Sequence, residues 1–197
     1  MLLGAACLVY MQEGEFIQWR DLFTSREFPY MSFGVFVLYN LFTFGFGEET
    51  GWCGFALPRL QANYNSWWAT VILTGIWAGW HIPLFLYRPG YVSMDIAGIF
   101  GWGLSLLTGS FLLSWFYNSS GGSILIVSIF HATIDLAFTS KASDGNVTMY
   151  MGMFITMWAI SVIGIQRFYS VKVKSSSLPP TTTRKDAKDT TQHYEYQ

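Results

Sequence analysis

The run IAGIFGWGLSLLTGSFLLSWFY, residues 96–117, decides what kind of fold this chain can have. It carries no charged side chain from end to end. A helix needs about 20 predominantly apolar residues to cross the hydrocarbon core of a bilayer. A water-soluble surface could not easily accommodate a segment of this kind. The run therefore predicts a helix that spans a membrane.

Four further segments approach the same length and apolarity, at residues 30–47, 67–87, 123–140 and 147–169. Amphipathic aromatic rings favour the two interfaces of a bilayer. Many Trp and Tyr residues fall at the ends of these segments: Tyr30, Trp67, Trp68, Tyr87, Trp115, Tyr117, Tyr150 and Tyr169. We expect an all-α, polytopic transmembrane helical bundle of about five spans with a partial N-terminal helix. Such a chain is a multi-pass integral membrane protein, with the lipid bilayer as its surroundings.

Composition agrees with this class. Hydrophobic residues make up 52% of the 197 residues and charged residues only 12%, against roughly 25% charged in soluble domains. The formal net charge of −1 argues against a nucleic-acid partner, because binding to phosphates needs a basic face.

The predicted organisation has three parts. Residues 1–29 form a partial helix and a polar connection, residues 30–170 form the transmembrane core, and residues 171–197 form a polar tail that we expect to be disordered. The opening segment, MLLGAACLVYMQ, is apolar but too short to span a bilayer. It suits either the end of a helix whose beginning is missing or a partial helix packed at one edge of the bundle.

Ionisable residues inside apolar segments are costly, so each one is a candidate functional group. Asp95 directly precedes the run at 96–117 and is predicted to cap that helix. The remaining candidates form three clusters, which are Glu48 with Glu49, His81 alone, and His131 with Asp135.

Each cluster also has a purely structural interpretation. The adjacent glutamates suit a solvated position at the membrane surface, and a lone buried histidine such as His81 is more often a satisfied core residue. His131 and Asp135 are four residues apart and therefore share a helix face. This spacing suits a carboxylate that orients an imidazole, two ligands of one metal, or a polar contact between helices.

Taken together, the clusters favour a site. The two histidines that lie in apolar segments are on separate helices, and the glutamate pair is at the end of a third segment. A bundle that joins them would bring together a base, two imidazoles and further carboxylates. Such groups can activate water for hydrolysis, and they are also ligand types that suit zinc.

Three motifs carry a resemblance to a known family. GEETGWCGFALPRL (47–60), WAGWHIPLF (77–85) and FHATIDL (130–136) resemble, in order and spacing, the motifs of the CPBP (CAAX protease and bacteriocin-processing, or Abi) intramembrane peptidases. This family includes the type II CAAX prenyl endopeptidases. The resemblance implies a membrane protease, possessing a metalloendopeptidase or glutamate-peptidase mechanism, that acts on a membrane-associated or lipidated peptide.

The resemblance also implies roles for single residues. Glu48 is expected to be the general base on water, Glu49 to support the site, and His81 to hold the nucleophilic water. His131, with Asp135, is expected to stabilise the oxyanion. If a metal such as zinc is used, Glu48, His81 and His131 are the expected ligands.

Three positions depart from the family pattern. Cys53 stands where arginine is usual, and a thiol cannot pair with a carboxylate as a guanidinium does. Asp135 stands where asparagine is common, and an ionised carboxylate only accepts hydrogen bonds. Trp77 replaces a usual phenylalanine. Arg59 lies beyond Pro58 and is not expected to replace the missing arginine.

These departures leave three hypotheses. The first is an intramembrane endopeptidase in which Glu48 activates water. The second is a catalytically weak or inactive immunity or scaffold protein on the same fold, which the cysteine favours. The third is a small transporter or metal-binding protein whose ion path is lined by the same polar groups.

Overall fold

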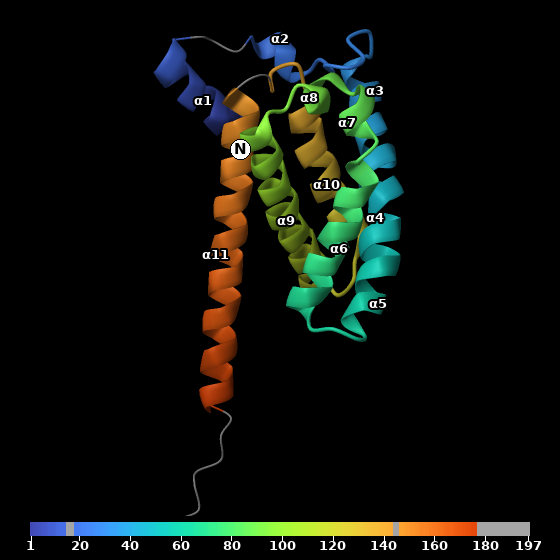
Figure 1. Cartoon of the computed structure of the whole chain (residues 1–197), viewed down its shortest axis with the longest axis vertical. Coiled ribbons are helices and arrows are strands. Elements are labelled where there is room, and N and C mark those ends of the chain that lie inside the picture. The colour runs from blue at the N-terminus through green and yellow to red at the C-terminus, as the bar shows by residue number, and fades with distance from the viewer. Residues whose placement is uncertain (15–17, 144–145, 177–197) are drawn as a thin grey trace, which may run out of the picture. The chain divides into compact units, whose positions relative to one another are not determined.

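The computed structural model describes residues 1–14, 18–143 and 146–176, and all of its regular elements are helical (Figure 1). The chain divides into two compact units, Met1–Val162 and Ile163–Gln197. The helices are α1 (Leu2–Glu13), α2 (Trp19–Leu22), α3 (Phe33–Asn40), η1 (Leu41–Phe46), α4 (Gly47–Gly51), η2 (Trp52–Ala56), α5 (Leu57–Gln61), α6 (Ser66–His81), α7 (Leu84–Tyr87), α8 (Pro89–Val92), α9 (Ile96–Ser119), α10 (Ile124–Thr139) and α11 (Asn146–Ser176). The predicted all-α bundle is confirmed.

Three described helical segments are long and apolar enough to cross a membrane: Ser66–Tyr87, Ile96–Ser119 and Asn146–Ile165. They match three of the five predicted spans. The fourth prediction, 123–140, is the 16-residue helix α10, which is shorter than the roughly 20 residues of a full span. The outer surface fits a bilayer, because large apolar side chains such as Leu86 and Phe100 are 81% and 76% exposed.

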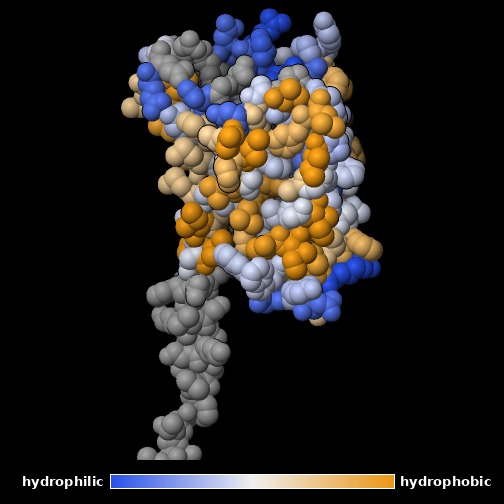
Figure 2. Space-filling view, viewed as in Figure 1, coloured by the Kyte–Doolittle hydropathy of each residue, from blue (hydrophilic) through white to orange (hydrophobic). Residues whose placement is uncertain are grey.

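The hydropathy of the surface of the Met1–Val162 unit changes along the length of the bundle. Figure 2 shows hydrophobic side chains gathered over the middle of the visible face and hydrophilic ones concentrated at its two ends. A belt of this kind is what a protein needs to sit in hydrocarbon between two aqueous phases.

The segment predicted as a span at 30–47 does not end at its glutamates. Helix continues without a break from Phe33 to Gln61, as α3, η1, α4, η2 and α5. The elements η1 and η2 are π-helical, and π-turns inside α-helices occur frequently at functional sites. Glu48 and Glu49 therefore lie in the middle of a helical run, and their backbone is held on both sides.

Helix ends follow local sequence signals. The Asp95 carboxylate accepts a hydrogen bond from the Gly98 N–H at 2.7 Å, which confirms the predicted cap of α9. Asn65 caps α6 in the same way, accepting from the Trp68 N–H at 3.0 Å. α6 ends at His81, two residues before Pro83, whose ring cannot continue a regular helix.

Hydroxyl groups join the long helices inside the bundle. Thr70 Oγ1 of α6 donates to Ser114 Oγ of α9 at 3.0 Å. Thr139 Oγ1 of α10 donates to the amide oxygen of buried Asn40 in α3 at 3.2 Å. In hydrocarbon, where lipid tails are as apolar as leucine, such bonds and close packing hold helices together. They fix the relative rotation of the helices that carry the site.

The N-terminal segment forms a helix, α1. Ala5 and Val9 of α1 are buried against Val147 and Met151 of α11. At the other end, α11 runs to Ser176, past the predicted boundary near residue 170. The rest of the predicted tail, 177–197, lies outside the described residues.

η1 and α10 approach each other closely at Gly45. A Cβ on Gly45 would lie 2.6 Å from the carbonyl oxygen of Ser128 and 3.2 Å from the Cβ of Ala132. Ala132 directly follows His131, and Gly45 is one helical turn before Glu49. Glycine at this position therefore allows the two helices that carry Glu49 and His131 to meet.

We expect Gly45→Ala to lower the free energy of unfolding by about 1–3 kcal/mol, because the added methyl group meets backbone that cannot move aside easily. Thermal unfolding in detergent micelles measures the effect. Gly34→Ala is the matched control in the same helical run, since no atom lies within 4 Å of its new Cβ. That control should be neutral or slightly stabilising. Equal unfolding temperatures for the two variants would contradict the close approach.

Candidate active site

Glu48 and Glu49 point in different directions. Neighbours on a helix are rotated by about 100°, so two adjacent carboxylates cannot both face one centre squarely. Glu49 is fully buried, with 0% exposure, and turns toward α10. Glu48 is partly buried and turns toward α6. The pair is therefore divided between two sets of partners and is not a solvated pair at the surface.

Glu49 binds His131, and His131 binds Asp135. His131 Nδ1 is 2.7 Å from Glu49 Oε1, and His131 Nε2 is 3.2 Å from Asp135 Oδ2. His131 is 4% exposed. A neutral imidazole donates from one nitrogen only, so both carboxylates receive a hydrogen bond only when the ring is protonated on both nitrogens. The spacing of four residues thus brings Asp135 into contact with the ring, as expected for two residues that share a helix face.

Glu48 is held by two indole groups. The Trp77 Nε1–H donates to Glu48 Oε2 at 2.9 Å, and the Trp52 Nε1–H donates to the same oxygen at 3.2 Å. Among the described residues, no hydrogen bond to Glu48 Oε1 is found. One oxygen of the carboxylate is thus fixed, and the other is available to a ligand.

His81, the last residue of α6, contacts the same tryptophan, Trp77. Its Nδ1 is 2.8 Å from the Trp77 carbonyl oxygen. A carbonyl oxygen only accepts, so Nδ1 carries the hydrogen and Nε2 is left to accept or to be protonated. The Trp77 ring packs edge-on against both imidazoles, 5.6 Å from His81 and 5.4 Å from His131 between ring centroids. The structure therefore gathers all three sequence clusters around Trp77.

A group of aromatic rings covers the outer side of His81. Tyr91 of α8 stacks on His81 with centroids 6.3 Å apart, and Trp102 of α9 packs edge-on at 5.8 Å. Burial raises the pKa of the Tyr91 phenol, and the charges of Asp135 and Glu48 raise it further, against a lowering by Arg88 and by the hydrogen bond from Trp102. The phenol keeps its proton at neutral pH and adds a neutral hydroxyl near the carboxylates.

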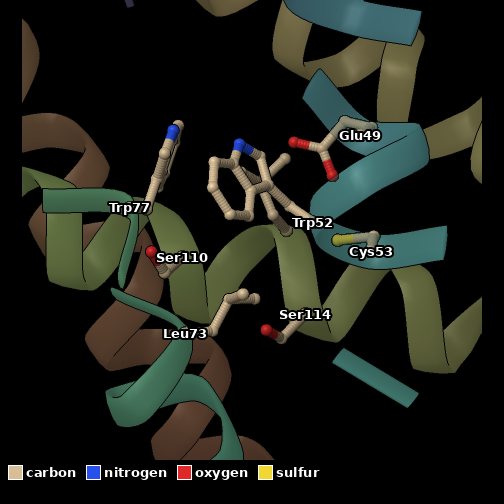
Figure 3. Close-up of a pocket in the computed structure, with 8 residues that line it drawn as sticks. Glu49, Trp52, Cys53, Leu73, Trp77, Ser110 and Ser114 are labelled. Carbon is tan, nitrogen blue, oxygen red and sulfur yellow. The ribbon is translucent and has the colours of Figure 1, made fainter. Parts of the chain in front are cut away.

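Cys53 lies at the inner end of the site. It is 1% exposed and lines a cavity of about 10 Å³ together with Glu49, Trp52 and Trp77 (Figure 3). That volume is room for about one water molecule. Arg59, one and a half turns later, points elsewhere and stacks on Phe55, 3.6 Å from the ring centroid. As expected, it does not replace the arginine that the family pattern has at position 53.

The arrangement does not suit the expected metal ligands. Within the described ranges, no three His, Cys, Asp or Glu side chains are placed to hold a metal ion together. Both ring nitrogens of His131 are already engaged by carboxylates, so neither offers a lone pair to a metal. Glu48, His81 and His131 gather around an indole ring, not around a common point.

Sequence reasoning missed the two indole donors. Trp77 was noted only as a replacement for phenylalanine, and Trp52 was not singled out. A signal was present, because Trp52 follows Glu48 by four residues and so shares its helix face. Trp77 makes its contact across 29 residues of sequence, and a contact of that kind depends on helix packing that the sequence does not display.

Comparison with known proteins covers the part of the chain that carries these residues. The family model described as type II CAAX prenyl endopeptidase Rce1-like matches residues 30–137, a stretch that contains Glu48, Glu49, His81, His131 and Asp135. CAAX prenyl protease 2 of Methanococcus maripaludis strain S2 is 29% identical over 116 residues, which cover 57% of this chain and 43% of that relative. The chain thus spans less than half the length of that relative. Since the family match extends over more than half of the chain and contains every residue of the site, the protein belongs to the Rce1-like family of type II CAAX prenyl endopeptidases.

Proposed function

We propose that this protein is a multi-pass, membrane-embedded endopeptidase that hydrolyses a peptide bond in a membrane-associated, prenylated substrate through water activated by Glu48. Family membership supports protease chemistry of the CAAX type. The observation that carries the mechanism is the Glu48 carboxylate, with one oxygen fixed by two indole N–H groups beside His81. A base held in this way is what general-base catalysis on water needs.

The proposed reaction begins at Glu48 Oε1. This oxygen takes a proton from a water molecule that His81 Nε2 helps to hold, and the water oxygen attacks the carbonyl carbon of the substrate. The carbon–nitrogen bond of the tetrahedral intermediate then breaks, and the proton on Glu48 passes to the leaving nitrogen. The products are a carboxylic acid and an amine, so that one water molecule is consumed for each bond cleaved.

His131 is proposed to stabilise the oxyanion. Its Nδ1–H bond to Glu49, at 2.7 Å, is the shorter of its two contacts and is completely buried. Its Nε2–H faces Asp135 at 3.2 Å, where the side chain of Asp135 is 25% exposed. The developing oxyanion would therefore compete with Asp135 for Nε2–H while Glu49 keeps the ring in place. A preorganised donor in an apolar site is among the largest contributions to catalysis.

The proposal is tested with the purified protein in proteoliposomes, with a farnesylated peptide that ends in a CAAX sequence and the same peptide without the lipid. Mass spectrometry should show a shortened product from the farnesylated peptide. The Glu48→Gln variant, argued in the Discussion, is the negative control. Absence of cleavage in both peptides would overturn the assignment of this substrate class.

One observation favours a second candidate, a catalytically weak or inactive scaffold on the same fold. Cys53 is buried beside Glu49, where the family pattern has arginine. If catalysis needs a cation there, the native chain is impaired. Replacing Cys53 by arginine tests whether the site needs a cation. The cavity next to Cys53 is far smaller than a guanidinium group, so the replacement also strains the packing.

We expect Cys53→Arg to abolish any cleavage that the native chain performs and to lower the free energy of unfolding by at least about 1–3 kcal/mol, the usual cost of overpacking. Trp52 and Trp77 line the cavity beside Cys53, so the longer arginine side chain would displace them. Cleavage rate and thermal unfolding in detergent are the measurements. Cys7→Arg is the matched control, because Cys7 is exposed. A gain of cleavage in Cys53→Arg would favour the scaffold and contradict this prediction.

A further inference from the structure

We propose that Trp77 is a positioning residue of this site, which holds both Glu48 and His81 in the geometry for hydrolysis. The inference rests on the proposed protease function. It extends that function to a residue to which neither the family resemblance nor the comparisons give a role. Trp77 would act through Glu48 and His81 without touching the reacting atoms.

The first contact is the hydrogen bond from the indole. Trp77 Nε1–H lies 2.9 Å from Glu48 Oε2. An indole nitrogen only donates, so this bond requires an acceptor and selects the orientation in which an oxygen of Glu48 faces α6. Trp52 donates to the same oxygen at 3.2 Å. Because both donors bind Oε2, the carboxylate cannot rotate without losing both bonds, and Oε1 stays turned toward the place where water would bind.

The second contact comes from the Trp77 backbone. Its carbonyl oxygen accepts the Nδ1–H of His81 at 2.8 Å. This bond sets the tautomer of His81 and leaves Nε2 for the proposed water. The indole ring also packs edge-on against His81 and His131, with centroids 5.6 and 5.4 Å away. A single residue thus determines where the base and the water-holding imidazole stand relative to each other.

Packing keeps Trp77 itself in place. The side chain is 9% exposed and belongs to a core cluster with Leu73, Leu106 and Leu113. Leu73 is one turn earlier on α6, whereas the other two leucines are on α9. The indole therefore cannot turn away from Glu48 without opening the contact between α6 and α9.

Two departures from the family pattern meet at this point. Phenylalanine at position 77 would have no N–H, and cysteine at position 53 has no guanidinium. Trp77 and Cys53 line the same cavity (Figure 3). In this chain the neutral N–H of Trp77 orients Glu48, and position 53 nearby carries a cysteine in place of a cationic arginine. The substitution at 77 therefore has a chemical consequence and is not a simple exchange of one aromatic ring for another.

The kinetic test replaces the N–H alone. Trp77 is exchanged for benzothienylalanine, in which sulfur takes the place of the indole N–H at nearly constant shape, and Trp77→Phe is the genetically simpler companion. For the isostere we expect kcat for the farnesylated peptide to fall about tenfold to a hundredfold, the usual worth of a hydrogen bond to a charged group. KM should stay unchanged, because Trp77 does not touch the substrate. Trp80, which is 65% exposed, is the matched control for the same exchange.

A second measurement reports the contact independently of activity. In protein labelled with ¹⁵N-tryptophan, the resonance of the Trp77 indole N–H, assigned by its loss in Trp77→Phe, should move upfield in Glu48→Gln. The Trp80 resonance should not move. An unmoved Trp77 resonance would overturn the proposal, and so would an isostere with the kcat of the native enzyme.

The two proposals can fail separately. If native protein and Glu48→Gln cleave equally well, the Glu48 mechanism fails, and the positioning role fails with it even if the resonance moves. If Glu48→Gln is inactive while the isostere is fully active, the protease proposal stands and only the role of Trp77 is overturned.

Discussion

Glu48→Gln is expected to lower kcat for peptide hydrolysis about a hundredfold to ten-thousandfold, the usual contribution of a general base. Glutamine has the shape of glutamate, and its amide oxygen can still accept from the Trp77 and Trp52 N–H groups that bind Glu48 Oε2. The fold and the indole contacts are therefore kept, and the proton acceptor is lost. Initial rates of product formation measure the effect, with thermal unfolding in detergent as the check on folding.

Asp95→Asn is the matched control for this change. It neutralises a carboxylate in the same chain, and asparagine caps a helix about as well as aspartate. Within the described part of the chain, the hydrogen bond found for the Asp95 side chain is the cap of α9, so cleavage should stay at the native rate. A Glu48→Gln enzyme with native kcat would show that the proton of the attacking water goes elsewhere, and it would end the proposed mechanism.

The membrane character of the fold could be predicted because it depends on composition along the chain. The length and apolarity of segments such as 67–87 and 96–117 can be read directly from the sequence. Both segments correspond to helices able to span a bilayer. The course of residues 33–61 could not be predicted in the same way. Its π-helical parts, η1 and η2, have no recognised signal in the sequence, and nothing in the residues shows that the helix continues past the glutamates.

For the site, sequence reasoning identified the ionisable residues but not their partners. The angle between neighbouring helix positions implied that Glu48 and Glu49 face different groups. Which of the two is buried depends on the rotation of the helix, and the structure buries Glu49 against His131. The contact between His131 and Asp135 is local and followed from their spacing. The role of Trp77 required the three-dimensional arrangement of α4 and α6.

The largest expected effect on stability comes from Glu49→Ala. Glu49 and His131 form a pair whose side chains are 0% and 5% exposed. Removing one member of a buried ion pair costs about 3–5 kcal/mol. Asp135 still contacts Nε2 in this variant, but the buried Nδ1 of His131 loses its acceptor. We expect a fall of that size in the free energy of unfolding, measured by thermal or denaturant unfolding in detergent micelles. Cleavage should be lost as well, because His131 is no longer oriented.

Two comparisons separate this explanation from a general effect of lost volume. Glu27→Ala breaks the ion pair between Glu27 and Arg88, whose side chains are 35% and 24% exposed, and should cost no more than about 1 kcal/mol. The double variant Glu49→Ala/His131→Ala removes the stranded imidazole together with its partner. Because the penalty of Glu49→Ala lies in the His131 Nδ1 that has lost its acceptor, the double variant should be less destabilised than the sum of the two single changes. The expected difference is about 0.5–3 kcal/mol, the range of coupling energies between residues in contact. Strictly additive losses would mean that Glu49 and His131 do not support each other, and the buried pair could then not be what keeps the imidazole in position for an oxyanion.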